Sequence, residues 1–267
     1  MVSIIVCGAG GRMGGRIITL LTQTEGTRLA GAVERPNHPL VGKDIGEALG
    51  LGTLGVPVTD DLSKVLNAGD VVIDFTHLDS ALRHIEMVLE TGKAIVVGTT
   101  GFEPSHIDRI KEWAKNGRCL IAPNMSVGVN LLFKLAYEVA KTLGDDYDVE
   151  ILEAHHNQKK DAPSGTAMKL GQQVAAALGR DLSKVGVYGR KGMIGARTKE
   201  EIGMQVIRGG DIVGEHTVFF IGTGERIELT HRAMSRDNFA RGAIRAAKWI
   251  VDQPNGLYDM QDVLGLE

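Results

Sequence analysis

Cysteines, long apolar runs and surplus positive charge are scarce or missing in this sequence. The chain has two cysteines, and both Cys7 and Cys119 stand among apolar neighbours, where small buried side chains are expected. We therefore expect no disulfide and no catalytic thiol. No run approaches the ~20 apolar residues that a membrane helix needs. The residues Met1–Gly8 contain no basic leader and resemble a strand. These absences predict a cytoplasmic globular protein.

The charge balance argues against nucleic acid as a partner. The chain has 30 Lys and Arg against 33 Asp and Glu, which gives a net charge of -3. Binding to nucleic acid depends on positive charge that displaces phosphate counterions. An anionic ligand must therefore be held by local features. A length of 267 residues favours two domains, because single cores rarely grow beyond ~250–300 residues.

Strand-like and helix-like stretches alternate through the first half of the chain. This alternation predicts a Rossmann-type, doubly wound parallel sheet in an α/β protein. The stretch Pro36–Pro57 is rich in Gly and Pro and predicts a long loop. Strands are expected at Ser3–Cys7, Arg28–Glu34, Val71–Phe75, Ala94–Gly98 and Cys119–Ala122, and helices at Met13–Thr24, Ser80–Glu90 and Ser105–Lys115.

The second half of the chain has a different pattern. A helix is expected at Leu131–Thr142, followed by a strand at Val149–Leu152. Three strand-like stretches then follow between glycine turns and predict an α+β domain with a mainly antiparallel sheet; they are Gly203–Ile207, Glu215–Ile221 and Arg226–His231. A last helix at Phe239–Val251 is expected to pack on the first domain. We expect a dinucleotide-binding domain at residues 1–126, completed by residues 236–267, and a second domain at residues 127–235.

A glycine-rich turn connects the first expected strand to the first helix. Gly8-Ala-Gly-Gly-Arg-Met-Gly14 has the placement of a dinucleotide loop, where glycines let a pyrophosphate approach the helix N-terminus. Its spacing departs from the strict pattern at Met13. Glu34 follows at the end of the second strand, where an acid contacts ribose hydroxyls, and Arg35 suits a 2′-phosphate. The acid and the base together predict that NADH and NADPH are both accepted.

Two further segments lie at the carboxyl ends of expected strands. They are Gly98-Thr-Thr-Gly101 and Ala122-Pro-Asn-Met125. In open parallel sheets the ligand lies across this edge of the sheet. We expect both segments to border the nicotinamide.

The segment Glu153–Ala167 contains, within fifteen residues, several side chains that can transfer protons or bind an anion. It contains His155, His156 and two lysines, and it joins a strand to a helix whose N-terminus attracts carboxylate or phosphate. Asp161 or Ser164 is expected to cap that helix, and backbone N–H groups there, including that of Ser164, are expected to be free for an anion. Taken singly, each histidine fits a packed imidazole and each lysine a solvated loop. Beside a nicotinamide site, the cluster instead indicates proton supply after hydride addition. No ligand spacing for zinc is complete, so we expect no metal.

The same segment closely resembles the signature of the 4-hydroxy-tetrahydrodipicolinate (dihydrodipicolinate) reductase family. Other stretches resemble that family along nearly the whole chain; they include Gly8–Gly14, Gly98–Gly101, Ser126–Asn130, Arg208–His216 and Gly256–Met260. The resemblance implies reduction of a cyclic dicarboxylate by NADH or NADPH in lysine and diaminopimelate biosynthesis. It also implies a homotetramer, with residues 127–235 forming a substrate-binding and oligomerisation domain.

Site residues follow from the resemblance position by position. It implies that His155 donates and accepts the proton, that Lys159 is a second proton donor, and that His156, Ser164, Gly165 and Thr166 hold the substrate. Lys160 lies at a variable position of the motif and is left out. The residues implied for the cofactor are Gly8, Ala9, Gly10, Gly11, Arg12, Met13, Glu34, Arg35, Gly98, Thr99, Thr100, Ala122, Pro123, Asn124 and Met125.

Two other functions are compatible with parts of the sequence. A different nicotinamide oxidoreductase is one alternative, although an acylating semialdehyde dehydrogenase needs a nucleophilic cysteine that neither Cys7 nor Cys119 provides. A sensor that binds dinucleotide without catalysis is the other. Such a sensor has no need for His155 and Lys159 together.

Overall fold

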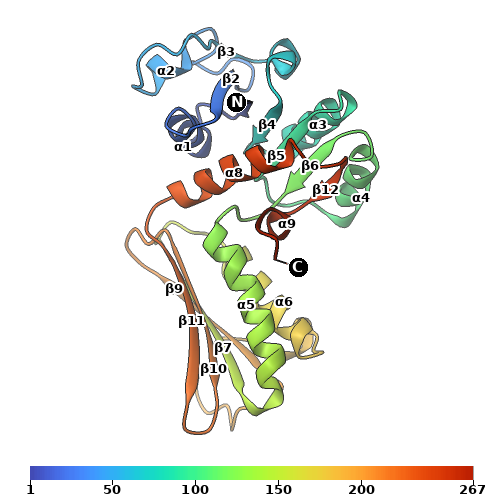
Figure 1. Cartoon of the computed structure of the whole chain (residues 1–267). Coiled ribbons are helices and arrows are strands. Elements are labelled where there is room, and N and C mark those ends of the chain that lie inside the picture. The colour runs from blue at the N-terminus through green and yellow to red at the C-terminus, as the bar shows by residue number, and fades with distance from the viewer. Residues whose placement is uncertain (267) are drawn as a thin grey trace. The chain divides into compact units, whose positions relative to one another are not determined.

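A computed structural model describes residues 1–266 and shows two compact units (Figure 1). The first unit contains Met1–Val127 and the chain from Asp237 onward, and the second contains Gly128–Arg236. In the described part of the chain, no helix has both the length and the apolar character required to cross a bilayer. The division of labour between the two units stays a prediction.

The first unit is built on a seven-stranded sheet in which every pairing is parallel. The strand order is β12-β6-β5-β4-β1-β2-β3. The doubly wound parallel sheet is therefore confirmed. Its strands are β1 (Val2–Cys7), β2 (Thr27–Val33), β3 (Val58–Thr59), β4 (Val71–Asp74), β5 (Ala94–Val97), β6 (Arg118–Ile121) and β12 (Gly256–Tyr258).

Helices cover both faces of this sheet (Figure 1). Side chains of β1 alternate between the two layers, so Ile4 packs in one core and Ile5 in the other. One face carries α1 (Arg12–Leu21) and α8 (Asp237–Ile250), and the other carries α3 (Leu78–Glu90) and α4 (Pro104–Trp113). The short helices are α2 (Ile45–Ala48), η1 (Leu62–Lys64), η2 (Leu66–Ala68) and α9 (Met260–Leu264). Cys7 and Cys119 are free and fully buried, as expected.

The second unit has a five-stranded sheet with the order β11-β10-β7-β9-β8. One face of this sheet packs against α5 and α6 through a core that includes Ile151, Met204 and Phe220. The strands are β7 (Asp148–His155), β8 (Gly186–Tyr188), β9 (Ile202–Arg208), β10 (Gly214–Ile221) and β11 (Arg226–Ala233). The helices are α5 (Val127–Leu143), η3 (Gly144–Asp146), α6 (Gly165–Ala177) and α7 (Leu182–Val185).

The pairing of β9 differs from the sequence-based expectation. Strands β10 and β11 pair antiparallel, as expected, and β10 also pairs antiparallel with β7. The antiparallel pairing expected for Gly203–Ile207 is wrong, because β9 runs parallel to both β7 and β8. The chain passes through α6 and α7 between β7 and β8, and a helical crossover returns a strand parallel to its predecessor.

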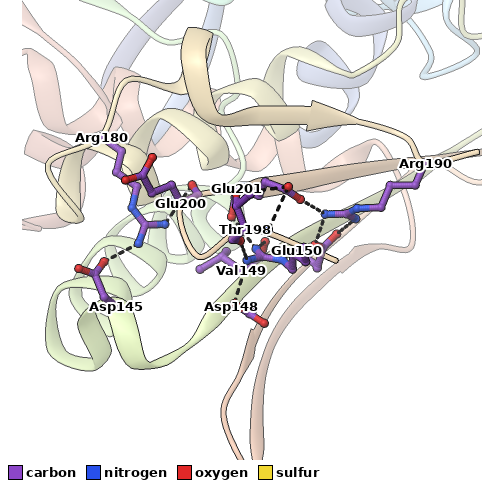
Figure 2. Close-up of polar contacts among 10 residues, drawn as sticks. Asp145, Asp148, Val149, Glu150, Arg180, Arg190, Thr198, Glu200 and Glu201 are labelled. Carbon is purple, nitrogen blue, oxygen red and sulfur yellow. Dashed lines mark hydrogen bonds and ion pairs between the residues drawn. The ribbon is translucent and has the colours of Figure 1, made fainter. Parts of the chain in front are cut away.

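The segment between β8 and β9 is fastened to the outer side of β7 by arginines (Figure 2). Arg190 donates two hydrogen bonds to Glu150, of 2.9 and 2.8 Å, and one of 3.0 Å to Glu201. Arg197 bonds Asp148 at 2.8 Å. Glu150 and Glu153 lie three positions apart on β7, so their side chains belong to opposite faces of the sheet. The Glu150 network is thus separate from the face that carries Glu153.

Candidate functional site

The loop between β1 and α1 is held by backbone contacts that require glycine. Gly8 has φ +75° and donates its N–H to Val33 O over 2.9 Å. Gly11 N–H donates to Gly8 O over 2.9 Å and precedes the helix as its N-cap. A Cβ on Gly14 would lie 2.1 Å from Gly8 O, so α1 starts against the loop only because this position is glycine.

The carboxylate of Glu34 closes the same loop from the end of β2. Its Oε1 accepts from Gly10 N–H at 2.9 Å, and its Oε2 accepts from the N–H of Arg35 at 3.0 Å. A Cβ on Gly10 would lie 2.8 Å from the ring of His38 and 3.3 Å from Glu34 Oε1. The Arg35 side chain is exposed beside this carboxylate. The loop, the acid and the base are therefore neighbours, as the sequence predicts.

A cavity of about 590 Å³ opens beside this loop within the first unit. Five of the residues expected to bind cofactor line it: Gly8, Gly10, Gly11, Glu34 and Arg35. The site of an elongated dinucleotide should have such a glycine floor with an acid at the end of the second strand, so these residues fit a dinucleotide.

Several polar residues of this cavity were missed by sequence reasoning. They are His38, Asp60, Asp61, Thr76, His77, Ser80, Arg83 and His84. Most follow β3 or β4 in the chain, and they carry no motif. Their one available signal was position, since ligands of open parallel sheets lie beyond the carboxyl ends of strands.

The remaining residues expected at the cofactor do not line this cavity. Thr99 and the segment around Asn124 follow β5 and β6, on the other side of β4 from the glycine loop. The Thr99 hydroxyl donates to Thr76 O over 2.8 Å, and Asn124 Oδ1 accepts from Ser126 N–H at 2.9 Å. Met125 is buried in the core. The residues outside the cavity lining are Ala9, Arg12, Met13, Gly98, Thr99, Thr100, Ala122, Pro123, Asn124 and Met125.

One group of metal-binding residue types occurs under this cavity in the described chain. Ligand atoms of Cys7, Asp74 and His84 all lie within 4.8 Å of one another. His84 Nδ1 lies 2.6 Å from Asp74 Oδ2, and Asp74 Oδ1 accepts from the N–H and the hydroxyl of Thr76. Burial raises the pKa of the Cys7 thiol, with Asp74 adding to the effect. These contacts explain the cluster as a hydrogen-bonded carboxylate beside a neutral thiol.

In the second unit, β7 leads into α6 through the segment that the sequence singles out. β7 extends to His155, which is three residues beyond the predicted end of the strand, and α6 begins at Gly165. Ser164 is the N-cap, and its Oγ accepts from Ala167 N–H at 3.2 Å. The strand-to-helix connection and one of the two proposed caps are thus confirmed.

A buried carboxylate organises this segment. Glu153 is 1% exposed, and its Oε2 accepts from His155 Nδ1–H at 2.5 Å and from Arg208 at 2.8 Å. Its Oε1 accepts from Ser164 N–H and from Arg208, both at 2.9 Å. Burial by itself raises the pKa of Glu153, but hydrogen bonds from His155, Arg208 and Ser164 outweigh it, and the pKa lies at about 2. Glu153 is therefore ionised at neutral pH.

The polar atoms of Ser164 are already engaged. Its N–H donates to Glu153, and its hydroxyl lies 3.1 Å from His216 Nε2. Ser164 is 3% exposed. The expectation of a free N–H at Ser164 is therefore wrong, because sequence spacing gave no sign that Glu153 would reach it. Gly165 is exposed, and a Cβ there would meet no described heavy atom within 4 Å.

The other expected substrate residues lie on the turn before α6. His156 follows the end of β7, and its Nδ1 accepts from Gln158 N–H at 3.2 Å. Lys159 Nζ lies 2.8 Å from Asp161 Oδ1. The hydrogen bond from Lys159 is the main cause that lowers the pKa of Asp161. The segment therefore gathers His155, His156 and Lys159 close to the N-terminus of α6.

Comparison with known proteins gives matches over both units. The family model described as "Dihydrodipicolinate reductase, N-terminus" matches residues 2–125, and "Dihydrodipicolinate reductase, C-terminus" matches residues 128–264. A protein of Syntrophus aciditrophicus named 4-hydroxy-tetrahydrodipicolinate reductase is 61% identical, with 99% of each chain covered. One of Geotalea daltonii with the same name is 59% identical, with 100% of each chain covered.

Solved structures are similar over the whole chain as well. The dipicolinate-bound dihydrodipicolinate reductase of Paenisporosarcina sp. TG-14 has a TM-score of 0.78 at 25% identity, and 98% of each chain is covered. An amine dehydrogenase from Mycobacterium smegmatis, at 16% identity and a TM-score of 0.62, shares the fold over 96% of this chain and 94% of its own.

Proposed function

Because the chain belongs to the dihydrodipicolinate reductase family, we propose that it catalyses the NAD(P)H-dependent reduction of 4-hydroxy-tetrahydrodipicolinate to tetrahydrodipicolinate. This reaction belongs to lysine and diaminopimelate biosynthesis. The observation that carries the proposal is the match of both units to one reductase family, with curated relatives near 60% identity over the full length. The protein is an oxidoreductase on this account.

The glycine loop of the first unit would hold the dinucleotide. Gly8, Gly10 and Gly11 line the cavity at the start of α1, where backbone N–H groups favour a pyrophosphate. Glu34 suits the ribose hydroxyls, and exposed Arg35 suits a 2′-phosphate, which supports use of either NADH or NADPH. When bound, the cofactor supplies a hydride. The roles of Gly98–Thr100 and Ala122–Met125 near the nicotinamide are part of the same proposal.

The second unit would supply the proton and bind the substrate. Reduction requires addition of a hydride and a proton, with loss of the 4-hydroxyl group as water. His155 donates the proton from Nε2, because its Nδ1 is directed at Glu153. Lys159 is the second donor and attracts a substrate carboxylate, for which it must exchange its contact with Asp161. His156, Gly165 and Thr166 hold the dicarboxylate at the helix start.

We also place the protein in the cytoplasm and expect a homotetramer. Apolar side chains exposed on the strands of the second unit support contacts between subunits; they are Val206, Ile207, Ile221 and Ile227. Light scattering coupled to size exclusion tests the subunit number.

A direct assay tests the proposed reaction. Freshly prepared substrate is added to purified protein with NADH or NADPH, and the loss of the reduced-nicotinamide absorbance is followed. Turnover is expected with both cofactors. Cofactor binding without turnover would instead identify a dinucleotide sensor.

A further inference from the structure

The contacts of Glu153 indicate a role for this residue, which is outside the proposed catalytic pair of His155 and Lys159. Glu153 and His155 lie two residues apart on β7, so their side chains share a face of the sheet. Glu153 is 1% exposed, and its two oxygens receive four hydrogen bonds, from His155, Ser164 and two nitrogens of Arg208. A buried carboxylate with this many donors is fixed in place.

We propose that Glu153 is a positioning residue that fixes the tautomer and ring orientation of His155, so that Nε2 is always the nitrogen that exchanges a proton with the substrate. This inference rests on the proposed role of His155. An ionised carboxylate only accepts hydrogen bonds. His155 must therefore keep a proton on Nδ1, 2.5 Å from Glu153 Oε2. After donation from Nε2, the neutral ring retains the Nδ1–H bond, and Nε2 regains a proton from solvent.

Arg208 supplies a permanent counter-charge to Glu153. A buried carboxylate is costly unless it is paired with a positive group. Here Arg208 contacts both carboxylate oxygens, at 2.8 and 2.9 Å. The negative charge of Glu153 is thus balanced by Arg208 in either protonation state of His155. Arg208 also donates to Asp161 O at 2.7 Å, which ties this network to the turn that carries Lys159.

A neutral imidazole borders the other side of the His155 ring. His216 packs edge-on against His155, with 5.2 Å between ring centroids and an interplanar angle of 74°. Burial, followed by the nearby charge of His155, lowers the pKa of His216 to about 3. A Cβ on Gly214 would lie 3.0 Å from His155 Nε2, so glycine leaves room beside that nitrogen. The ring is therefore bounded by Glu153, His216 and Gly214.

The replacement Glu153→Gln tests the tautomer directly. The carboxamide has one acceptor oxygen for four donors. Ser164 N–H and Arg208 cannot become acceptors, whereas an imidazole can, by moving its proton to Nε2. The amide NH2 group should then face His155 Nδ1. Nitrogen-15 NMR of histidine-labelled protein, with His155 assigned through His155→Asn, should show Nδ1 protonated in the wild type at every pH at which the protein is folded. In Glu153→Gln, the neutral ring should be the Nε2–H form.

Kinetics separate positioning from simple support of the fold. Glu153→Gln should lower kcat by ~100-fold or more, as loss of a tautomer-fixing carboxylate does in hydrolase triads, with NADPH affinity unchanged. In a His155→Asn background, the same replacement should have almost no further effect. Glu150→Gln is the matched control, because Glu150 also pairs with arginine (Figure 2). It lies on the same strand as His155, but five positions away and therefore on the opposite face of the sheet. The control should leave kcat and the histidine spectrum unchanged.

Several outcomes would overturn the proposal. One is a wild-type spectrum in which Nδ1 of His155 is unprotonated. This measurement does not depend on the folding of any variant. A second is an unchanged His155 tautomer in Glu153→Gln. A third is a double variant in which the loss of kcat caused by Glu153→Gln adds fully to the loss caused by His155→Asn. If the wild type binds cofactor but does not turn over, the proposed function fails, while the spectra still decide whether Glu153 fixes His155.

Discussion

Lys159 and Asp161 form an ion pair, with 2.8 Å between Nζ and Oδ1, on the turn that precedes α6. The lysine side chain is 21% exposed, and its aspartate partner is 61% exposed. A partly exposed pair of this kind contributes little to stability. Its consequence is positional, because the pair holds the ammonium group on the turn before the helix. On the proposed function, a substrate carboxylate would replace Asp161.

Replacing Lys159 with Ala should therefore impair turnover rather than folding. Loss of a proton donor and anion partner is expected to lower kcat/KM by at least ~100-fold. NADPH affinity should stay the same, because Lys159 lies in the second unit. Lys160→Ala is the matched control, since Lys160 is the exposed neighbour. Equal losses in both variants, measured by initial rates, would remove the role given to Lys159.

Cofactor preference should depend on Glu34 and Arg35. Arg35→Ala should weaken the binding of NADPH by ~10-fold and that of NADH much less, because only NADPH carries a 2′-phosphate that can pair with the guanidinium. Glu34→Gln should weaken the binding of NADH more than that of NADPH, since the Glu34 carboxylate is expected to accept hydrogen bonds from the ribose hydroxyls. Dissociation constants by calorimetry at one fixed salt concentration check this. Parallel shifts for both cofactors in Arg35→Ala would speak against a phosphate contact.

The glycine loop should tolerate no side chain at Gly14. A Cβ there would lie 2.1 Å from Gly8 O, which is backbone and cannot step aside. Gly14→Ala should destabilise the first unit by about 1–3 kcal/mol or more. At Gly209 a Cβ would meet no described heavy atom within 4 Å, so Gly209→Ala is the control for stability. Thermal unfolding should separate the two variants, and similar melting temperatures would contradict the packing argument.

Acid should destabilise the protein partly through Glu153. Its pKa falls from an ordinary 4.5 to about 2 in the folded chain. The unfolded state therefore binds the proton first, so this stabilisation is complete above pH 4.5 and is lost as the pH falls toward 2. The loss amounts to at most about 3 kcal/mol. Urea unfolding at a series of pH values should show this slope in the wild type, and Glu153→Gln should lack it.

His216 should cause a second loss of folding stability on acidification, which begins at a higher pH than the loss due to Glu153. Its pKa is lowered from 6.5 to about 3, chiefly by burial, so the folded state resists its protonation. Stability should begin to fall as the pH drops below about 6.5 and continue to fall toward pH 3. His216→Gln should flatten the upper part of this range while leaving the lower part that belongs to Glu153. An unchanged slope in His216→Gln would show that His216 is not buried in the neutral form.

Local patterns predicted the first unit because its signals are contiguous in sequence. The run Gly8–Gly14, with Glu34 at the end of the next strand, folds into one loop, and alternating strands and helices dictate a parallel sheet. The short strand Gly256–Tyr258 was missed, since three residues carry no periodicity, and it joins the sheet only by pairing with β6. Asp60 and His77 reach the cavity from the ends of β3 and β4, and His84 reaches it from α3; sequence spacing does not reveal that these residues meet.

In the second unit, the sequence indicated a candidate segment but not how its atoms pair. Residue types and the neighbouring helix start pointed to the cluster, and the family resemblance implied the roles of His155 and Lys159, which stay predictions. The contacts of Glu153 with Ser164 and Arg208 span 11 and 55 residues along the chain. Arg208 lies directly opposite His155 only because β9 runs parallel to β7. An expectation of antiparallel strands could not have placed it there.

Transfer of deuterium from the cofactor to the product is a direct test of the proposed hydride transfer. NADH carrying deuterium at the transferred position of the nicotinamide is mixed with freshly made 4-hydroxy-tetrahydrodipicolinate and the purified protein, and the product is analysed by mass spectrometry. The account predicts tetrahydrodipicolinate with one deuterium for each NADH oxidised, formed by the wild type and strongly slowed in His155→Asn. Intact cofactor, or oxidised cofactor with no deuterium in the product, would contradict it.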